Sequence, residues 1–192
     1  MKEMSFDEIE SGMTYEDTIF SSSQFNNQVD EVTFKNCIFT QDSFKKYEFL
    51  DCQFNGIDFS NKNMENCVIY RSSFNKCKLV GTSLINSTLK DVLFKNSKID
   101  FSNFSGSKLS NCSINNSDCN DVYFIEVIFK GKFFCQQSTL NRCNFSETNL
   151  KGVDISESTF DTIVVQPERL KGLKINYTQA AQLIPLLGVI IK

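Results

Sequence analysis

The chain has 192 residues, which is enough for one domain with a substantial core or for two very small ones. It contains 19 Phe but no His, and its formal net charge is −3. The absence of His excludes Ser–His–Asp triads, histidine metal sites and imidazole acid–base chemistry. Because the net charge is weakly negative, we expect no direct nucleic-acid binding through phosphate neutralisation, whereas a basic protein partner is compatible with it.

The N-terminal segment, residues 1–31, is strongly acidic. It holds eight acidic groups and one basic group, a net charge of −7, whereas the rest of the chain has a net charge of +4. The sequence begins MKEMSFDEIESG, which has neither the basic end nor the apolar stretch of a signal peptide. No apolar run approaches the ~20 residues that cross a bilayer. We therefore expect a cytoplasmic protein that makes no membrane contact.

Apolar residues recur every five positions along most of the chain. From Phe34 to Phe134, 21 consecutive positions of this register are apolar, and after a one-residue slip the register resumes at Leu140 and continues to Phe160. A period of five matches neither an amphipathic helix nor an alternating strand. The pattern therefore indicates an internal repeat, which must be identified before any other element is assigned.

An earlier phase of the repeat lies at Tyr15, Phe20 and Phe25. Nine residues separate Phe25 from Phe34, one fewer than two repeat units. We interpret the intervening NNQVDEVT as a junction or small loop near the first coil.

Each five-residue unit combines a large apolar residue with a small one and a turn-forming one. The residue two positions before the central one is usually small or Cys, which places two inward side chains in each unit. The residue two positions after it is usually Asn, Asp or Gly, the types that tolerate tight turn conformations. Examples of this third position are Asn36, Asp51, Gly56, Asn61, Asn66, Gly81, Asn86 and Asp91.

The segments FKNCIFTQDSF and SNFSGSKLSNCSINNSDCNDVYF resemble the pentapeptide-repeat family, and the resemblance extends over about residues 15–165. It implies an all-β fold, a right-handed quadrilateral β-helix with four units in each 20-residue coil. Stacking every twentieth residue then places one apolar ladder in the core, which stabilises a solenoid by burying continuous surface between coils. This ladder comprises Phe34, Phe54, Phe74, Phe94, Ile114 and Phe134. About seven coils at ~4.8 Å each would give a rod near ~35 Å long.

Three small-residue positions carry long or charged side chains, Asp42, Lys62 and Lys132. Asp42 and Lys62 are 20 residues apart and therefore stack in adjacent coils. If they point inward they should pair, because an unpaired buried charge is costly. Alternatively, the local backbone turns both toward solvent. Lys132 adjoins the slip in register and is expected to reach water.

No chemistry typical of an enzyme is found in the sequence, and we predict neither catalytic residues nor cofactors. The eight Cys include no C-x-x-C spacing. Most of them occupy inward positions, so we interpret them as reduced core residues rather than metal ligands or disulfides. The inward set is Cys37, Cys52, Cys67, Cys77, Cys112, Cys119 and Cys143.

The sequence divides into a repeat body over residues 1–165, with regular coils from about residue 32, and a C-terminal segment, residues 166–192. Gln-Pro-Glu-Arg at 166–169 predicts a helical turn. A short helix is then expected from about Gln179 to Leu187, with Thr178 as its N-cap and Gly188 at the position after its C-cap. Pro185 would end or kink it.

The C-terminal segment is expected to cap the last coil, whose backbone and apolar ladders would otherwise be open. Either it only caps the rod, or it also pairs with a second copy to form a homodimer with the rods pointing apart. We favour the homodimer because the segment is rich in apolar residues. The predicted interface comprises Leu183, Leu186, Leu187, Val189, Ile190 and Ile191.

Within the family, an uninterrupted solenoid with a terminal LLGVII segment is similar to the Qnr-type quinolone-resistance proteins. This resemblance implies that the protein binds the type II topoisomerases DNA gyrase and topoisomerase IV, and protects them from quinolones by partial imitation of duplex DNA. The net charge of +4 outside residues 1–31 and the lack of long loops between Phe34 and Phe134 depart from that pattern. A generic protein-interaction solenoid or an immunity protein with another partner is the alternative. The candidate contact residues are Asp58, Asp100, Asp118 and Asp121.

Overall fold

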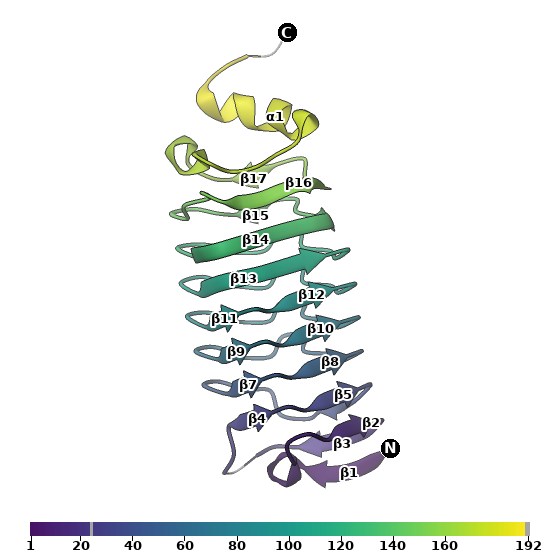
Figure 1. Ribbon diagram of the computed structural model, residues 1–192. Helices are drawn as coiled ribbons and strands as arrows, with labels where there is room; N and C mark the ends of the chain where they lie inside the picture. Colours follow the sequence, from purple (N-terminus) through teal and green to yellow (C-terminus); the bar gives the residue numbers. More distant parts are fainter. Residues whose placement is uncertain (24, 191–192) are drawn as a thin grey trace.

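The chain forms one elongated stack of coils, with the N-terminus at one end and the only α-helix of the described residues at the other (Figure 1). The computed structural model describes residues 1–23 and 25–190. No helix in these ranges is both long and apolar enough to cross a membrane. The strands are β1 (Lys2–Ser5), β2 (Thr14–Glu16), β3 (Thr18–Ser21), β4 (Gln28–Asp30), β5 (Thr33–Lys35), β6 (Ile38–Phe39), β7 (Glu48–Leu50), β8 (Gln53–Asn55), β9 (Val68–Tyr70), β10 (Ser73–Asn75), β11 (Thr88–Lys90), β12 (Leu93–Lys95), β13 (Lys108–Asn115), β14 (Ile128–Thr139), β15 (Cys143–Asn144), β16 (Val153–Thr159) and β17 (Ile163–Val164). The helical elements are the 3-10 helices η1 (Phe6–Glu8), η2 (Pro167–Leu170) and η3 (Ile184–Leu187) and the helix α1 (Tyr177–Leu183).

The strands pair in parallel with those about 20 residues away. In the central coils, Phe74 of β10 pairs with Phe54 of β8 on one side and with Phe94 of β12 on the other. The result is a parallel β-solenoid of about eight turns, one more than the sequence indicated. The predicted all-β, four-unit coil is confirmed.

The backbone turns at the position two residues after each central side chain. All eight turn residues that the sequence identified have positive φ, from 51° at Asn36 to 69° at Gly56. Asn, Asp and Gly adopt this left-handed conformation at lower cost than other residues. The five-residue period therefore reflects a corner that recurs at the end of every short strand.

The interior of the coil is an aromatic column. The rings of Phe34, Phe54, Phe74 and Phe94 stack with centroid distances of 5.4, 4.8 and 5.0 Å between successive pairs. All four side chains are fully buried. The eight Cys are buried and free, as the sequence suggested for seven of them.

Phe134 does not belong to this ladder, contrary to the sequence prediction. β14 shifts register against β13 between Ser110 and Cys112, so that Cys135 pairs with Ile114 and Phe134 pairs with Ser113. The extra residue therefore lies before Phe134, near Gly131, and not after it. Cys135 takes the ladder position, and Phe133 is buried beside Cys112, at a position where other coils carry small residues.

The N-terminal coil also differs from the predicted register. Phe25 is 90% exposed, and Val29 occupies the inward position and pairs with Phe49. The open end of the rod is instead closed by Phe6 from η1. Its ring lies edge-on to several others, with centroid distances of 5.8 Å to Phe39 and 5.9 Å to Phe44.

At the other end, η2 confirms the predicted helical turn, and α1 covers the last coil (Figure 1). The N-cap of α1 is Asn176 and not Thr178, because the Asn176 side chain and that of Gln179 form a reciprocal capping box. The α-helix ends at Leu183, before Pro185, and continues as η3 to Gly188, whose φ is +72°.

Candidate interaction surfaces

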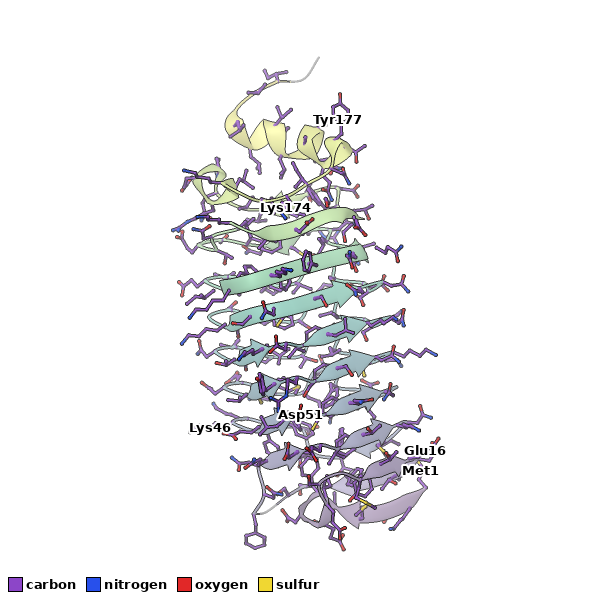
Figure 2. The ribbon with its side chains drawn as sticks, viewed as in Figure 1. Met1, Glu16, Lys46, Asp51, Lys174 and Tyr177 are labelled. Atoms are coloured by element: carbon purple, nitrogen blue, oxygen red, sulfur yellow. The ribbon has the colours of Figure 1, made fainter. Side chains whose placement is uncertain are left out.

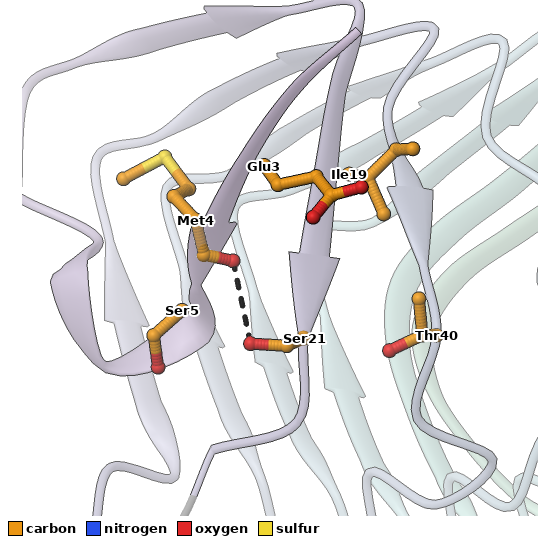
Figure 3. A pocket seen from close by; sticks show the side chains of 6 residues that line it. All are labelled: Glu3, Met4, Ser5, Ile19, Ser21 and Thr40. Atoms are coloured by element: carbon orange, nitrogen blue, oxygen red, sulfur yellow. Dashed lines mark hydrogen bonds between the residues drawn. The ribbon is translucent and has the colours of Figure 1, made fainter.

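The described residues offer surfaces rather than an enclosed site. They hold no group of three or more Cys, Asp or Glu side chains that could bind a metal ion. Figure 3 shows a hollow at the N-terminal end, where Ser21 Oγ donates a hydrogen bond to the Met4 carbonyl at 3.5 Å. Its lining comprises Glu3, Met4, Ser5, Ile19, Ser21 and Thr40. The outer faces of the rod are the other candidate sites.

Two of the four candidate acidic residues lie in a column interrupted by cations. Asp58, Lys78, Lys98 and Asp118 pair in succession along one face of the rod. The Lys78 ammonium lies 3.8 Å from a carboxylate oxygen of Asp58. This column is therefore mixed in charge and does not form a continuous acidic stripe.

The other two candidates are held by neighbouring coils. Asp100 Oδ1 accepts hydrogen bonds from the backbone N–H and side-chain amide of Asn120, at 2.9 and 2.8 Å. Asp121 lies at the adjoining corner, where Arg142 forms a two-pronged pair with it at 2.7 and 2.6 Å. The hydrogen bonds from Arg142 lower the pKa of the Asp121 carboxyl. The structure thus places three candidates on one face and the fourth at its edge.

Asp42 and Lys62 form the expected pair, but neither alternative holds in full. The Lys62 ammonium lies 3.3 Å from Asp42 Oδ1. The Asp42 side chain is 99% exposed, whereas the Lys62 side chain is only 13% exposed, so of the two Asp42 alone points to solvent. Lys132 is exposed as well, as expected.

Acidic residues are concentrated at the N-terminal end of the rod. Residues 1–31 form the first coils and the cap, so their net charge of −7 is concentrated there. Figure 2 shows Met1 and Glu16 together at this end, far from Lys174 and Tyr177. Within this segment, the side chains of Glu3, Glu8, Glu10, Glu16, Asp17 and Glu31 are exposed.

A lysine-rich face lies opposite the face of Asp58 and Asp118. The two faces are ten residues apart in a 20-residue coil, which puts them on opposite sides of the rod. We call it the cationic face; it comprises Lys90, Lys108, Lys130, Lys132 and Lys151, all exposed. Lys90, Lys108 and Lys130 flank the central residues Leu89, Leu109 and Phe129 of this face.

A third face is free of charge over four coils. Its paired column comprises Ser83, Asn103, Tyr123 and Asn144, and Tyr123 is exposed. Phe101 lies at the adjoining corner with a φ of +62°, a costly conformation for a bulky side chain, and is 57% exposed. No sequence pattern singled out Phe101, because it falls at a turn position and outside the apolar register.

The C-terminal end carries an open apolar groove between the last coil and the helices. Leu183, one of the predicted interface residues, is 7% exposed and belongs to the core of its own chain. Leu186, Leu187, Val189 and Ile190 are exposed, and Ile191 lies outside the described residues. The groove is lined by Leu170, Leu173, Ile175, Ala180, Leu183, Ile184 and Leu187.

Comparison with known proteins agrees with this architecture. A family model described as "Pentapeptide repeat region" matches residues 27–104 and 47–124, and one described as "Pentapeptide repeats (8 copies)" matches residues 117–156 and 135–162. No curated protein matches the sequence. Similar solved structures include HetL of the cyanobacterium Nostoc sp. strain PCC 7120, with a TM-score of 0.61, 9% identity and coverage of 90% of this chain and 84% of HetL. A trypsin-treated variant of QnrB1, a plasmid-mediated fluoroquinolone resistance protein, has a TM-score of 0.43, 14% identity and coverage of 100% and 98%.

The likeness to HetL concerns the fold alone. The two family models together span residues 27–162, well over half of the chain, in the same coils that the structure builds from the five-residue repeat. The chain is a member of the pentapeptide-repeat family.

Proposed function

We propose that this protein is a non-enzymatic cytoplasmic protein that binds bacterial type II topoisomerases, DNA gyrase or topoisomerase IV, and protects them from quinolones or related poisons. The enzyme class comes from the resemblance to Qnr-type proteins in the uninterrupted solenoid and the terminal apolar segment. The observation that carries the proposal is the acidic end of a rigid rod, where residues 1–31 have a net charge of −7. A protein groove that receives DNA phosphates attracts such a surface, and salt weakens the attraction.

The proposed contact is local and does not follow the full length of a DNA duplex. Asp58 and Asp121 contact Lys78 and Arg142 of their own chain, so their charges are partly compensated. The acidic end has only one basic residue, Lys2, among its 31 residues. We therefore expect the acidic end to contribute more to binding than the four candidate Asp residues, and imitation of DNA to be partial.

Quinolone susceptibility of bacterial cells that express the protein tests this proposal. We expect the wild-type protein to lower susceptibility, and reversal of three exposed charges in Glu3→Lys, Glu10→Lys, Glu16→Lys to abolish the effect. Glu126→Lys, Glu157→Lys, Glu168→Lys is the matched control, because it changes the net charge equally on exposed residues toward the other end. Full protection by the first variant would exclude the acidic end as the contact. Unchanged susceptibility with wild-type protein would remove the topoisomerase proposal.

We further propose that two copies associate through the C-terminal groove. Exposed apolar residues of a second copy, such as Leu187 and Val189, fit the chemistry of this lining, and a self-complementary patch gives a twofold dimer. With about eight turns per rod, the dimer would extend over roughly 80 Å. Sedimentation should report a dimer at micromolar concentration for the wild type and for Phe25→Asp at the far end, but a monomer for Leu187→Asp. A monomeric wild type would contradict this.

The alternative is a protein-interaction solenoid with an unrelated partner. The observation that favours it is the uncharged face, because depletion of charge and exposed aromatic side chains are typical of the centre of a protein interface. If cells expressing the protein show unchanged drug susceptibility, and neither gyrase nor topoisomerase IV responds to it, this alternative becomes the better account.

A further inference from the structure

The lysines of the cationic face have no carboxylate partners, which the net charge of the whole chain does not reveal. All three arginines form ion pairs with acidic residues of neighbouring coils, namely Arg71 with Asp51, Arg142 with Asp121 and Arg169 with Glu147. Among the described residues, none of the five lysines of the cationic face forms a salt bridge. These cations are therefore not neutralised by an ion pair, although the Lys90 ammonium lies over the Tyr70 ring at 4.9 Å.

The backbone arranges the same lysines in a regular array. Lys90 pairs with Ser110, which pairs with Lys130, so the two lysines lie in one column with their backbones two rungs apart, about 10 Å along the rod. Lys108 lies in the parallel column of the same face, paired with Ile128. The strands β13 and β14 run without a break over this face and the next one (Figure 1).

The register shift adds another cation to the array. The extra residue of β14 brings Lys132 to the corner, where its backbone N–H donates a hydrogen bond to Asn111 Oδ1 at 3.2 Å. The φ of Gly131 is +66°, a conformation that favours glycine, and a Cβ there would lie 2.2 Å from the same oxygen, so that the Asn111 side chain would have to move. Four anions lie nearby. Asp91 accepts a hydrogen bond from the Asn111 amide, Asp154 pairs with Lys174, and Glu126 and Glu147 line one hollow with Lys151.

The composition of the face suits a polyanion, because its lysines are point charges spread along the rod. The forked guanidinium of Arg matches both carboxylate and phosphate, whereas Lys binds either as a point charge. Duplex DNA presents such charges in an unbroken row, about one for every 1.7 Å of its axis. A single strand would need exposed aromatic rings on which its bases could stack. The Tyr70 ring is already covered by the Arg71 guanidinium at 4.1 Å and the Lys90 ammonium at 4.9 Å. The rings of Phe129 and Phe134, which line hollows with Lys151 and Lys132, are only partly exposed.

We propose that the cationic face binds the phosphate backbone of duplex DNA, without reading its sequence. This inference goes beyond the topoisomerase proposal and does not depend on it. It also replaces the expectation of no nucleic-acid binding, which was drawn from the net charge of the whole chain. In the folded rod, the charge of −7 lies at one end and the five lysines lie on one side of the upper coils.

Fluorescence anisotropy with a labelled 20-base-pair duplex tests the proposal on the full chain. We expect binding at 50 mM salt that weakens ~150-fold by 200 mM, the change expected for four phosphate contacts. The double variant Lys108→Glu, Lys130→Glu should weaken binding at least tenfold. The matched control, Lys35→Glu, Lys76→Glu, changes the net charge equally on exposed residues elsewhere and should weaken it less than threefold.

Four results would overturn the proposal. They are no duplex binding at 50 mM salt, equal losses in the two double variants, tighter binding of a single strand, and binding of polyglutamate in preference to DNA. The last result would identify an acidic protein as the partner. If the Lys108→Glu, Lys130→Glu variant fails to fold, Lys108→Gln, Lys130→Gln removes the same two cations without adding negative charge and should weaken binding at least threefold.

Discussion

Replacement of Phe74 by Ala tests whether the aromatic column holds the solenoid together. Phe74 is fully buried and stacks on Phe54 at 4.8 Å and on Phe94 at 5.0 Å. Truncation of a buried Phe to Ala costs about 3–5 kcal/mol, and each lost ring stack adds about 0.5–1.5 kcal/mol. We expect the free energy of unfolding to fall by about 5 kcal/mol, the upper end of the range for Phe→Ala truncation, because two stacks are lost.

Urea unfolding measures this loss. With an m-value of about 2 kcal/mol/M, the midpoint should fall by about 2.5 M for Phe74→Ala and by less than about 0.75 M for Phe74→Leu, which retains most of the volume. Phe25→Ala is the control, because this ring is 90% exposed and its loss should change stability by less than about 0.5 kcal/mol. A midpoint for Phe74→Ala within 0.5 M of the wild type, a threshold of about 1 kcal/mol at the same m-value, would refute the reasoning.

Three further predictions concern the register, the strained corner and the thiols. In the same urea assay, Phe133→Ala should lower the free energy of unfolding by about 3–4 kcal/mol and Phe134→Ala by less than about 1 kcal/mol. A larger loss for Phe134→Ala than for Phe133→Ala would support the register predicted from the sequence instead. Phe101→Asn should raise the melting temperature by about 2–3 °C, because Asn adopts positive φ at lower cost; an unchanged or lower value would argue against strain at this corner. Burial raises the pKa of the Cys52 and Cys67 thiols to about 12. From pH 9 toward 12 only the unfolded chain ionises these thiols, so the free energy of unfolding should fall as the pH rises over that range. Below pH 9 the contribution of the thiols to stability should be constant. A thiol reagent at pH 8 should therefore find no fast-reacting Cys in the folded protein and eight after denaturation, and rapid reaction of the folded protein would contradict the buried assignment.

The repeat body could be predicted because one physical constraint is imposed on every unit. Each inward position must be apolar, and each corner must adopt positive φ, so the same residue types return every five positions. One bulky residue at a corner, such as Phe101, does not obscure a pattern that recurs in every coil. The fold and the ladder from Phe34 to Phe94 follow from this redundancy.

The register near Phe134 could not be predicted from the pattern, because two adjacent Phe residues satisfy either phase. The structure resolves the ambiguity at Gly131, where a residue without Cβ fits over Asn111 and the strand gains one residue. A glycine one coil above an Asn was visible in the sequence, but it also occurs where no residue is inserted, for example Gly56 above Asn36. Such a pair therefore marks a corner and does not locate the bulge.

At both ends of the rod the structure differs from the prediction, for a related reason. The repeat constrains inward residues only where coils lie on both sides, and the first coil has a neighbour on one side. Phe6 therefore closes the core from outside the register, and Phe25 is left exposed. At the other end, the pattern Asn176-x-x-Gln179 is a capping-box signature that the choice of Thr178 overlooked.

The ion pairs between coils explain why the four candidate Asp residues form a weaker acidic surface than the sequence suggested. Residues about 20 positions apart stack in a coil of this length, so each acidic residue has to be compared with the residues one coil above and below. Asp58 and Lys78 are 20 apart, and Asp121 and Arg142 are 21 apart because the bulge lies between them. Pairing of charges was therefore readable from the sequence once the coil length was known.

The effect of the purified protein on DNA gyrase supercoiling in the presence of an inhibitory quinolone tests the proposed function most directly. The proposal predicts that increasing protein concentration restores supercoiling, and that the Glu3→Lys, Glu10→Lys, Glu16→Lys variant restores less than the wild type. Restoration should also weaken as the salt concentration is raised, because the attraction is electrostatic. No restoration by wild-type protein at any concentration, with gyrase and with topoisomerase IV, would contradict the account.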